Sequence, residues 1–228
     1  MKRRAVIFDM DGVLIDSYHP HLEAWMRLGR TLGRPITEAE FIPTFGRRNP
    51  EIFQTFWPGV VPEADVPRWS DWKEATYREI LMADFPAMDG ARELLDALKA
   101  AGFALAVGSS GPPLNVSVAV EGLGRAHLFD ATVNSTEVVE GKPHPQVFLR
   151  AAEKMGMEPR ACAVVEDSLA GLEAARRAGM TPIGLTGTFP KEKLLGHAAC
   201  VVESLRELTP AGIAALIDRH AANLASNR

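Results

Sequence analysis

Residues 5–12 have the sequence Ala-Val-Ile-Phe-Asp-Met-Asp-Gly, in which four apolar residues lead into two acids and a glycine. A strand that is apolar throughout, rather than alternating, is typical of a parallel sheet covered on both faces. Four later segments are similarly apolar, namely residues 103–107, 163–165, 182–185 and 200–202. We therefore expect five buried strands in one parallel sheet.

Helical patterns separate these strands along the chain. Leu94, Leu95 and Leu98 share one helix face, and further helical patterns cover residues 147–155 and 169–178. A glycine follows the end of each pattern, as is common where helices stop. This alternation of strand and helix predicts an α/β fold with a doubly wound sheet.

The segment from about residue 16 to residue 85 interrupts the alternation. It lacks a buried-strand pattern and contains helical segments rich in Trp, Arg and Glu. Five prolines divide these segments: Pro35, Pro43, Pro58, Pro62 and Pro67. We interpret residues 16–85 as a helical insertion in a core made of residues 1–15 and 86–228. Because the insertion follows the first strand at its carboxyl end, where open α/β sheets bind ligands, we expect it to cover a site there.

Composition and charge narrow the possible partners. The 228 residues carry 25 Lys and Arg against 29 Asp and Glu, a net charge of −4, which disfavours nucleic-acid binding through phosphate neutralisation. The apolar run after the basic start stops at Asp9, too early for a signal peptide or a membrane span. We expect a cytoplasmic protein with a small-molecule partner and no membrane partner, present as a monomer or weak homodimer.

The two cysteines, Cys162 and Cys200, are not spaced as a redox or metal motif. Each lies in or beside a segment rich in Val and Ala that is typical of a protein core. We therefore expect two buried, free thiols.

Asp9 and Asp11 follow the first strand two residues apart, so on extended backbone both carboxylates point to the same side. Like charges in this arrangement repel, unless a cation lies beside them or one acid holds a proton. Both arrangements belong to active sites. The alternative is a solvated turn in which Gly12 supplies the bend.

The strand at residues 103–107 continues into Gly108-Ser109-Ser110-Gly111-Pro112. These small residues expose hydroxyls and backbone N–H groups just before a helix that we expect to start at Pro112 or Pro113. Such a geometry suits an anion. The alternative is an ordinary helix cap.

Two further segments place polar side chains after an apolar segment or in a loop, namely residues 141–145 and 166–167. In Gly141-Lys142-Pro143-His144-Pro145, the first proline favours an extended Lys142, although an exposed loop lysine is the alternative. Glu166 and Asp167 end another apolar strand, as ligands of a hard cation or as the cap of the helix that follows. Because a doubly wound sheet gathers its ligands at successive strand ends, we interpret all four segments as one site.

In this order, Asp9-Met10-Asp11-Gly12-Val13, Ser109, Lys142-Pro143 and Glu166-Asp167-Ser168 resemble the four motifs of the haloacid dehalogenase-like superfamily, particularly its β-phosphoglucomutase-like phosphatases. The resemblance covers nearly the whole chain. It includes Asp16-Ser17 after the first motif and Gly171 in the helix after the fourth. It implies a Rossmann-like doubly wound parallel sheet core with a small α-helical cap inserted after the first strand.

The resemblance also implies catalytic roles. Asp9 is the expected nucleophile and Asp11 the general acid and base, while Ser109 and Lys142 hold the phosphate. Asp9 would attack phosphorus as Asp11 protonates the leaving alkoxide, and Asp11 would then take a proton from the water that attacks the aspartyl phosphate. An acid at position 11 favours a phosphate ester over a haloacid, because the dehalogenase branch usually lacks Asp there.

Mg²⁺ is the implied cofactor. Its expected ligands are Asp9, the backbone carbonyl of Asp11 and Asp167, with Glu166 as a direct or indirect partner. A phosphate monoester repels an anionic attacker, so the positive charges of Mg²⁺ and Lys142 are needed before a carboxylate can approach phosphorus.

The candidate substrate-binding residues are Ser110, through its backbone amide, and five residues of the insertion: His21, Trp25, Arg47, Arg48 and Lys73. His21, Trp25 and Lys73 have spacings that resemble those of β-phosphoglucomutases. The alternatives are core packing for Trp25, a surface or hinge role for His21, and a solvated face for the three basic residues.

The segment Gly46-Arg47-Arg48-Asn49-Pro50 resembles the substrate loop of the family. Its arginines are offset from the position expected in a mutase. This difference favours a phosphatase.

We therefore predict a Mg²⁺-dependent phosphatase that hydrolyses a small phosphorylated metabolite, with a sugar phosphate favoured, through an aspartyl phosphate. The nearest alternative is a β-phosphoglucomutase, in which the aspartyl phosphate persists long enough to phosphorylate the sugar again. A phosphoaspartate signalling receiver is more distant, since Asp11 and the insertion are features that a receiver does not need. A catalytically silent binding module is disfavoured, because every motif position carries a competent residue.

Overall fold

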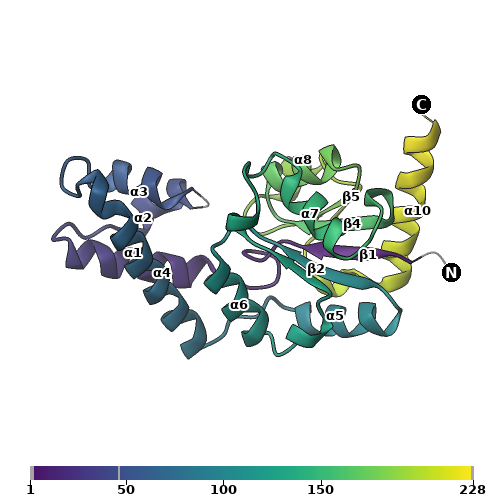
Figure 1. Cartoon of the computed structure of the whole chain (residues 1–228), viewed down its shortest axis with the longest axis horizontal. Helices are drawn as coiled ribbons and strands as arrows, with labels where there is room; N and C mark the ends of the chain where they lie inside the picture. Colours follow the sequence, from purple (N-terminus) through teal and green to yellow (C-terminus); the bar gives the residue numbers. More distant parts are fainter. Residues whose placement is uncertain (1–2, 46, 227–228) are drawn as a thin grey trace. The chain divides into compact units, whose positions relative to one another are not determined.

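The structure, a computed structural model, describes residues 3–45 and 47–226. Its sheet has six parallel strands in the order β3-β2-β1-β4-β5-β6 (Figure 1). The strands are β1 (Ala5–Phe8), β2 (Ala104–Gly108), β3 (Ala131–Val133), β4 (Cys162–Glu166), β5 (Thr181–Leu185) and β6 (Cys200–Val202). From β1 the chain adds β2 and β3 on one side and then β4, β5 and β6 on the other side. The sheet is therefore doubly wound, which confirms the predicted fold class.

The prediction of five strands was wrong by one, because β3 was missed. This strand has only three residues, and only Val133 is buried. Ala131 and Thr132 are half-buried because β3 lies at the edge of the sheet. Thr132 in the middle of β3 interrupts the continuous apolar run by which the other strands were identified.

Helices cover both faces of the sheet. One face packs against α7 and α8, whose Val147, Phe148, Ala174 and Ala175 join alternate residues of the central strands in one buried cluster. Helix α5 lies on the opposite side (Figure 1). The helices of this unit are α5 (Ala91–Ala100), α6 (Pro113–Gly122), α7 (Gln146–Lys154), α8 (Leu169–Arg177), α9 (Lys191–Leu194) and α10 (Pro210–Ser226). Short 3₁₀ turns are η3 (Ala126–Leu128), η4 (Ser135–Glu137), η5 (Pro159–Ala161) and η6 (Leu205–Glu207).

A second compact unit, Ser17–Pro86, is separate from the unit that contains the sheet. Its helices are α1 (Tyr18–Thr31), α2 (Glu38–Phe41), α3 (Asn49–Phe56) and α4 (Val66–Ala83), with 3₁₀ turns η1 (Ile42–Thr44) and η2 (Glu63–Asp65). We call this unit the cap. Its core is largely aromatic, and Trp25 and Trp57 stack with ring centroids 6.1 Å apart.

The chain leaves the sheet unit after residue 16 and returns to it at residue 87, and these two connections lie side by side. Ile15 forms an antiparallel bridge with Ala87, and the Met88 N–H donates to the Leu14 carbonyl at 2.9 Å.

Both cysteines are free thiols. Cys162 is buried in β4, and burial raises the pKa of its thiol to about 12. The prediction that Cys200 is also buried was wrong. Cys200 is half-buried, because it begins the edge strand β6.

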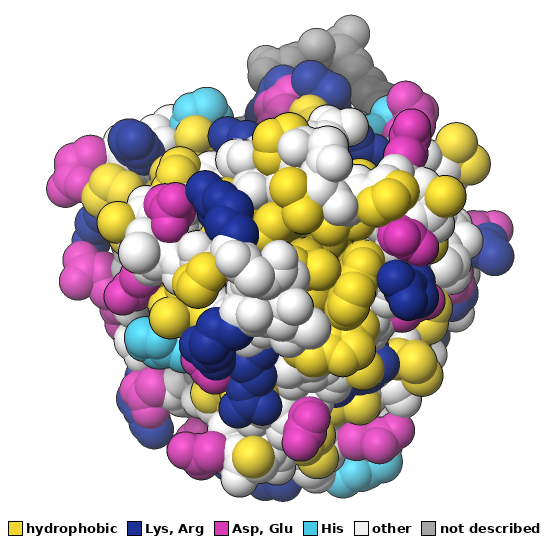
Figure 2. All heavy atoms as spheres, turned by 90° about the vertical axis from the view of Figure 1, so that its left-hand side faces the viewer, with side chains coloured by type: hydrophobic (Ala, Val, Ile, Leu, Met, Phe, Trp, Pro, Cys, Tyr) yellow, Lys and Arg dark blue, Asp and Glu magenta, His cyan; other side chains and the backbone are white. Residues whose placement is uncertain are grey.

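The surface is mixed in character. On the face that Figure 2 shows, basic and acidic side chains surround adjoining apolar side chains near the centre of the view. Among the described residues, none of the helices combines the length and the hydrophobicity that a bilayer crossing requires.

The burial of β2 generates a stability prediction. Leu105 has no exposed surface, so Leu105→Ala should lower the free energy of unfolding by about 2–5 kcal/mol through lost apolar burial and a cavity. Thermal unfolding measures the change. Leu195→Ala is the matched control, because Leu195 is 56% exposed and its truncation should leave the Tm nearly unchanged. Equal effects of the two substitutions would contradict the assigned core.

Candidate active site

The site lies at the carboxyl ends of the three central strands. Asp9 follows β1, Ser109 follows β2, and Glu166 is the last residue of β4. The hydrogen bonding of the sheet continues past the strands, since the Asp9 N–H donates to the Val165 carbonyl at 3.0 Å. Parallel strands end at the same edge of the sheet, so all three residues are placed at that edge.

Lys142 joins two of the acids. Its Nζ donates to Asp9 Oδ1 at 2.5 Å and to Glu166 Oε1 at 2.7 Å. The Nζ also lies 4.9 Å from the centre of the Phe148 ring. The Lys142 side chain is only 8% exposed, which excludes the alternative of an exposed loop lysine.

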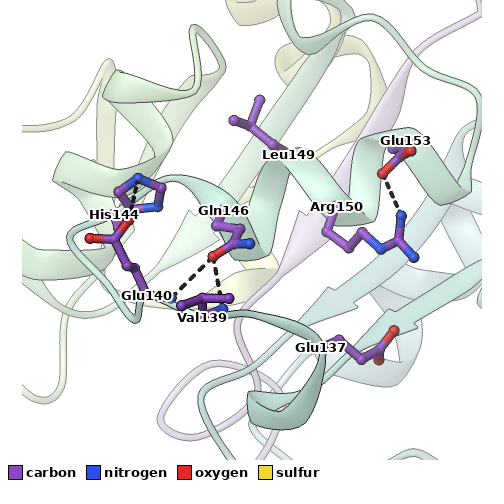
Figure 3. A pocket seen from close by; sticks show the side chains of 8 residues that line it. All are labelled: Glu137, Val139, Glu140, His144, Gln146, Leu149, Arg150 and Glu153. Atoms are coloured by element: carbon purple, nitrogen blue, oxygen red, sulfur yellow. Dashed lines mark hydrogen bonds and ion pairs between the residues drawn. The ribbon is translucent and has the colours of Figure 1, made fainter.

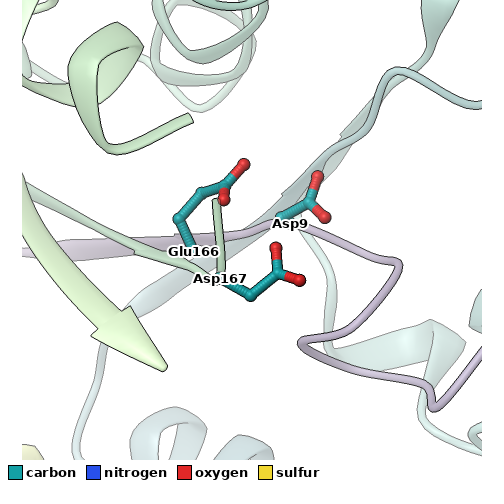
Figure 4. Close-up of side chains that lie close together, drawn as sticks. All are labelled: Asp9, Glu166 and Asp167. Atoms are coloured by element: carbon teal, nitrogen blue, oxygen red, sulfur yellow. The ribbon is translucent and has the colours of Figure 1, made fainter. Parts of the chain in front are cut away.

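Asp9, Glu166 and Asp167 form a buried cluster of carboxylates, which we call the acidic cluster (Figure 4). One oxygen from each lies within 4.8 Å of the others. Burial and the charges of Glu166 and Asp11 raise the pKa of Asp9 to about 7, although Lys142 opposes this shift. Burial, Glu166 and Asp9 likewise raise the pKa of Asp167 well above its usual range.

The pKa of Lys142 is raised, although burial of an amine normally lowers its pKa. Burial lowers the pKa of this amine, but the charges and hydrogen bonds of Asp9 and Glu166 raise it above its usual value. The lysine is therefore charged, and it faces three buried carboxylates. The negative charge left over and the hard oxygen donors fit a divalent cation such as Mg²⁺.

The carboxylates of Glu166, the last residue of β4, and of Asp167, which follows it, accept hydrogen bonds from neighbouring residues. Glu166 Oε2 accepts hydrogen bonds from the Ser168 N–H at 2.6 Å and from the Ser168 hydroxyl at 2.9 Å. The Thr188 hydroxyl donates to Asp167 Oδ2. Thr188 was not among the predicted site residues, although its hydroxyl follows the end of β5 as the Ser109 hydroxyl follows the end of β2.

Gly171 makes room for Glu166. A Cβ atom at this position of α8 would lie 1.7 Å from Glu166 Oε1. The carboxylate therefore occupies the space that any other residue at position 171 would fill.

The first-motif turn brings Asp11 and Gly12 beside the acidic cluster. The Leu14 N–H donates to the Met10 carbonyl at 2.9 Å, which closes the turn. Asp11 is half-buried, and its charge contributes to the raised pKa of Asp9. Gly12 has φ +76°, and a Cβ there would lie 2.3 Å from Asp167 Oδ2, so both conformation and space require glycine.

The second motif has a buried and an exposed serine. Ser109 is buried, and its hydroxyl accepts a hydrogen bond from the Gly111 N–H at 2.9 Å. Ser110 is exposed in the loop that precedes α6, which starts at Pro113.

Three predicted substrate residues cluster within the cap. Lys73 Nζ lies 2.8 Å from His21 Nδ1 and 5.3 Å from the centre of the Trp25 ring. Lys73 is 2% exposed, which excludes a solvated face for this residue. Trp25 belongs to the aromatic core, in line with its packing alternative.

Two neighbours of this cluster were missed by the sequence analysis. Glu74 Oε1 accepts a hydrogen bond from Lys73 Nζ at 2.9 Å, and the Tyr77 ring stacks on His21 with centroids 3.9 Å apart. The available signal was their closeness to Lys73 in the predicted helix: Glu74 is the next residue, and Tyr77 lies one turn further along.

The two arginines have a different environment. Arg47 and Arg48 are exposed, and Arg48 Nε pairs with Glu51 Oε1 at 2.7 Å. The interpretation of residues 46–50 as a substrate loop includes Gly46, which lies outside the described residues.

Comparisons with known proteins give concordant matches. A family model described as haloacid dehalogenase-like hydrolase matches residues 3–179. The chain is 33% identical to the validoxylamine A 7′-phosphate phosphatase of Streptomyces hygroscopicus subsp. limoneus, over 90% of this chain and 95% of that protein. It is 30% identical to the phosphorylated carbohydrates phosphatase of Thermotoga maritima, over 86% of this chain and 92% of that protein.

Among solved structures, a HAD hydrolase of family IA, variant 3, from Entamoeba histolytica superposes with a TM-score of 0.85 and 28% identity. The match covers 94% of this chain and 99% of that structure.

The contact between Gly171 and Glu166 generates a second prediction. Gly171→Ala should displace the Glu166 side chain and lower the free energy of unfolding by about 1–3 kcal/mol through overpacking. The Tm measures the effect. Gly184→Ala in β5 is the control, since a Cβ there meets its neighbours at 3.4 Å or more. If the two variants unfold at the same temperature, the close approach of Glu166 to α8 is refuted.

Proposed function

Because the chain belongs to the haloacid dehalogenase-like hydrolases, we propose that it is a Mg²⁺-dependent phosphatase that hydrolyses a phosphorylated sugar through an aspartyl phosphate. Hydrolysis of a phosphoric monoester is the activity that the family and both phosphatase relatives support. The observation that carries the proposal is the charged Lys142 held between Asp9 and Glu166 at the strand ends. The reaction takes place, in this proposal, in the cytoplasm.

Asp9 is the nucleophile. Its position directly after the central strand fixes its backbone, and Lys142 opposes the rise in its pKa that burial causes. Lys142 therefore favours the ionised carboxylate that attack on phosphorus requires. The bond from Asp9 to phosphorus forms as the bond from phosphorus to the ester oxygen breaks.

Asp11 moves the protons. In the first half-reaction its carboxylic acid gives a proton to the departing alkoxide, which leaves as the free alcohol. In the second, the Asp11 carboxylate takes a proton from water as that water attacks the aspartyl phosphate, which releases inorganic phosphate and regenerates Asp9. The half-buried position of Asp11 beside Asp9 suits both roles.

The acidic cluster and the backbone carbonyl of Asp11 would hold Mg²⁺. The bound ion supplies positive charge that offsets the phosphate and the three carboxylates. Lys142 adds a second positive charge through its contact with Asp9. Ser109 donates its hydroxyl proton to a phosphate oxygen, and the Ser110 backbone N–H is a further donor.

A phosphorylated sugar is the substrate class that we favour. Both phosphatase relatives act, by name, on a phosphorylated carbohydrate or a related phosphate. Within the cap, we assign substrate binding to His21 and Lys73, with Trp25 orienting Lys73 through its ring. Arg47 and Arg48 are exposed cations for a substrate phosphate or hydroxyl.

Loss of the nucleophile tests the reaction. Asp9→Asn should reduce phosphate release by at least about 10³-fold, because a neutral amide cannot form the aspartyl phosphate. The measurement is Mg²⁺-dependent release of inorganic phosphate from phosphorylated sugars, nucleotides and phosphoglycolate. Asp71→Asn, at an exposed position of α4, is the control and should retain activity. Turnover by Asp9→Asn at the normal rate would remove the mechanism.

The same assay separates hydrolysis from the mutase alternative. β-Glucose 1-phosphate is supplied with a bisphosphate primer, and isomerisation is measured beside phosphate release. Because the two reactions share an aspartyl phosphate, only the relative rates of transfer to sugar and to water distinguish them. A large excess of isomerisation would reassign the protein as a phosphoglucomutase.

Metal binding is tested by stability rather than activity. Mg²⁺ at about 100 times its Kd should add about 2.7 kcal/mol to the free energy of unfolding of the wild type, because it binds only the folded site. Asp167→Asn should abolish this gain. In the absence of metal, the same substitution should raise the Tm, because burial and repulsion disfavour the charged form of Asp167. A Mg²⁺ shift that survives Asp167→Asn contradicts the assigned ligands, and Na⁺ at equal ionic strength is the control.

A further inference from the structure

We propose that Gln146 is a positioning residue for Lys142. Its side-chain amide clamps the start of the loop that carries the lysine and so fixes where the ammonium group lies. The inference rests on the proposed function, in which Lys142 binds the transferring phosphate.

The clamp is a pair of hydrogen bonds to consecutive backbone groups. Gln146 Oε1 accepts from the Val139 N–H at 2.9 Å and from the Glu140 N–H at 3.1 Å (Figure 3). Gln146 is the first residue of α7, so the bonds tie the beginning of the loop to the beginning of the helix. Lys142 lies between these two fixed points.

Apolar contacts among the described residues do not fix the start of the loop, residues 139–141. Val138 packs against the buried cluster of the sheet, but the next residue, Val139, is 92% exposed. Glu140 and Gly141 are exposed as well. Apolar packing therefore ends at Val138 and resumes at Val147, the second residue of α7. Between them the backbone depends on hydrogen bonds for its position.

Two further contacts lie within the same loop. The His144 N–H donates to the Gly141 carbonyl at 2.9 Å, which closes the turn around Lys142 but does not tie it to the rest of the protein. The other contact is a weaker ion pair. His144 Nε2 lies 3.1 Å from Glu140 Oε2, and both side chains are substantially exposed. Exposed ion pairs contribute little, and this one also requires a protonated histidine. The two bonds to Gln146 are directed at backbone N–H groups and do not depend on protonation.

The position of Lys142 needs such support. Its Nζ contacts Asp9 at 2.5 Å and Glu166 at 2.7 Å, so a displacement of about 1 Å would break both contacts. A misplacement of that size can reduce an enzymatic rate by about 100-fold. Gln146 touches none of the reacting groups in this arrangement and acts through the lysine.

Substitution of the acceptor tests the clamp. Gln146→Met keeps the length of the side chain and removes the acceptor, and should lower kcat/KM by about 10–100-fold. Gln146→Glu retains an oxygen at the same place and should stay within about 3-fold of the wild type. Gln54→Met, at an exposed position of α3, is the matched control and should have no effect.

A double-mutant cycle separates positioning from general damage. If Gln146 acts through Lys142, then Gln146→Met should change kcat/KM by less than about 2-fold in a Lys142→Met background. A further 10-fold loss in that background would show a separate role and overturn the inference. The Tm of Gln146→Met should fall by only about 2–4 °C, as expected from the loss of one surface clamp.

Two readouts do not require turnover. In Gln146→Met, the Val139 and Glu140 amides should exchange hydrogen at least about 10-fold faster than in the wild type and in Gln146→Glu. Acetylation of Lys142 by acetic anhydride, followed by mass spectrometry with the exposed Lys193 as reference, should increase at the same time.

The outcomes distinguish the two proposals. A wild-type protein that releases no phosphate refutes the proposed function, while amide exchange and lysine acetylation still test the clamp. Unchanged exchange and unchanged acetylation in Gln146→Met would overturn the positioning role, whatever the activity of the wild type.

Discussion

The contact of one ammonium group with two buried carboxylates is the interaction on which the site depends. Buried ions are costly unless they are paired and hydrogen-bonded, and Lys142 supplies both for Asp9 and Glu166. The pairing is incomplete, because Asp167 adds a third buried acid. The protein thus concentrates negative charge where the proposed mechanism places a cation and an ionised nucleophile. The raised pKa values of Asp9 and Asp167 are the electrostatic cost of this arrangement.

The backbone makes that concentration sterically feasible. A parallel sheet brings the ends of β2, β1 and β4 side by side, so residues distant in the sequence meet without long connecting loops. Two glycines then allow the acids to approach the backbone closely. Gly12 leaves space for Asp167, and Gly171 leaves space for Glu166. Serine and threonine hydroxyls complete the hydrogen bonding of the two carboxylates.

Sequence patterns identified the central strands and the motif acids because burial on both faces leaves a clear apolar signal. They missed β3, which has only three residues, of which Ala131 and Thr132 are half-buried. They also missed Thr188, because the strand-end argument that identified Ser109 was not applied to the residues after β5. In the cap, the sequence pointed to Lys73 but not to its partner Glu74, because neighbouring opposite charges on a helix are usually exposed to solvent. Lys73 is buried and Glu74 half-buried because their helix, α4, packs against α1 and α3, which supply His21 and Asn49 as hydrogen-bonding neighbours.

The bridge between Ile15 and Ala87 has an architectural consequence. Because the chain leaves the sheet unit and returns to it at residues that are hydrogen-bonded neighbours, the whole of Ser17–Pro86 is inserted at a single point of that unit. A segment attached in this way imposes almost no constraint on the strands that carry the proposed nucleophile. If the inserted module binds the substrate, as we propose, its mutation, lengthening or exchange changes substrate choice and leaves the sheet unit unaltered.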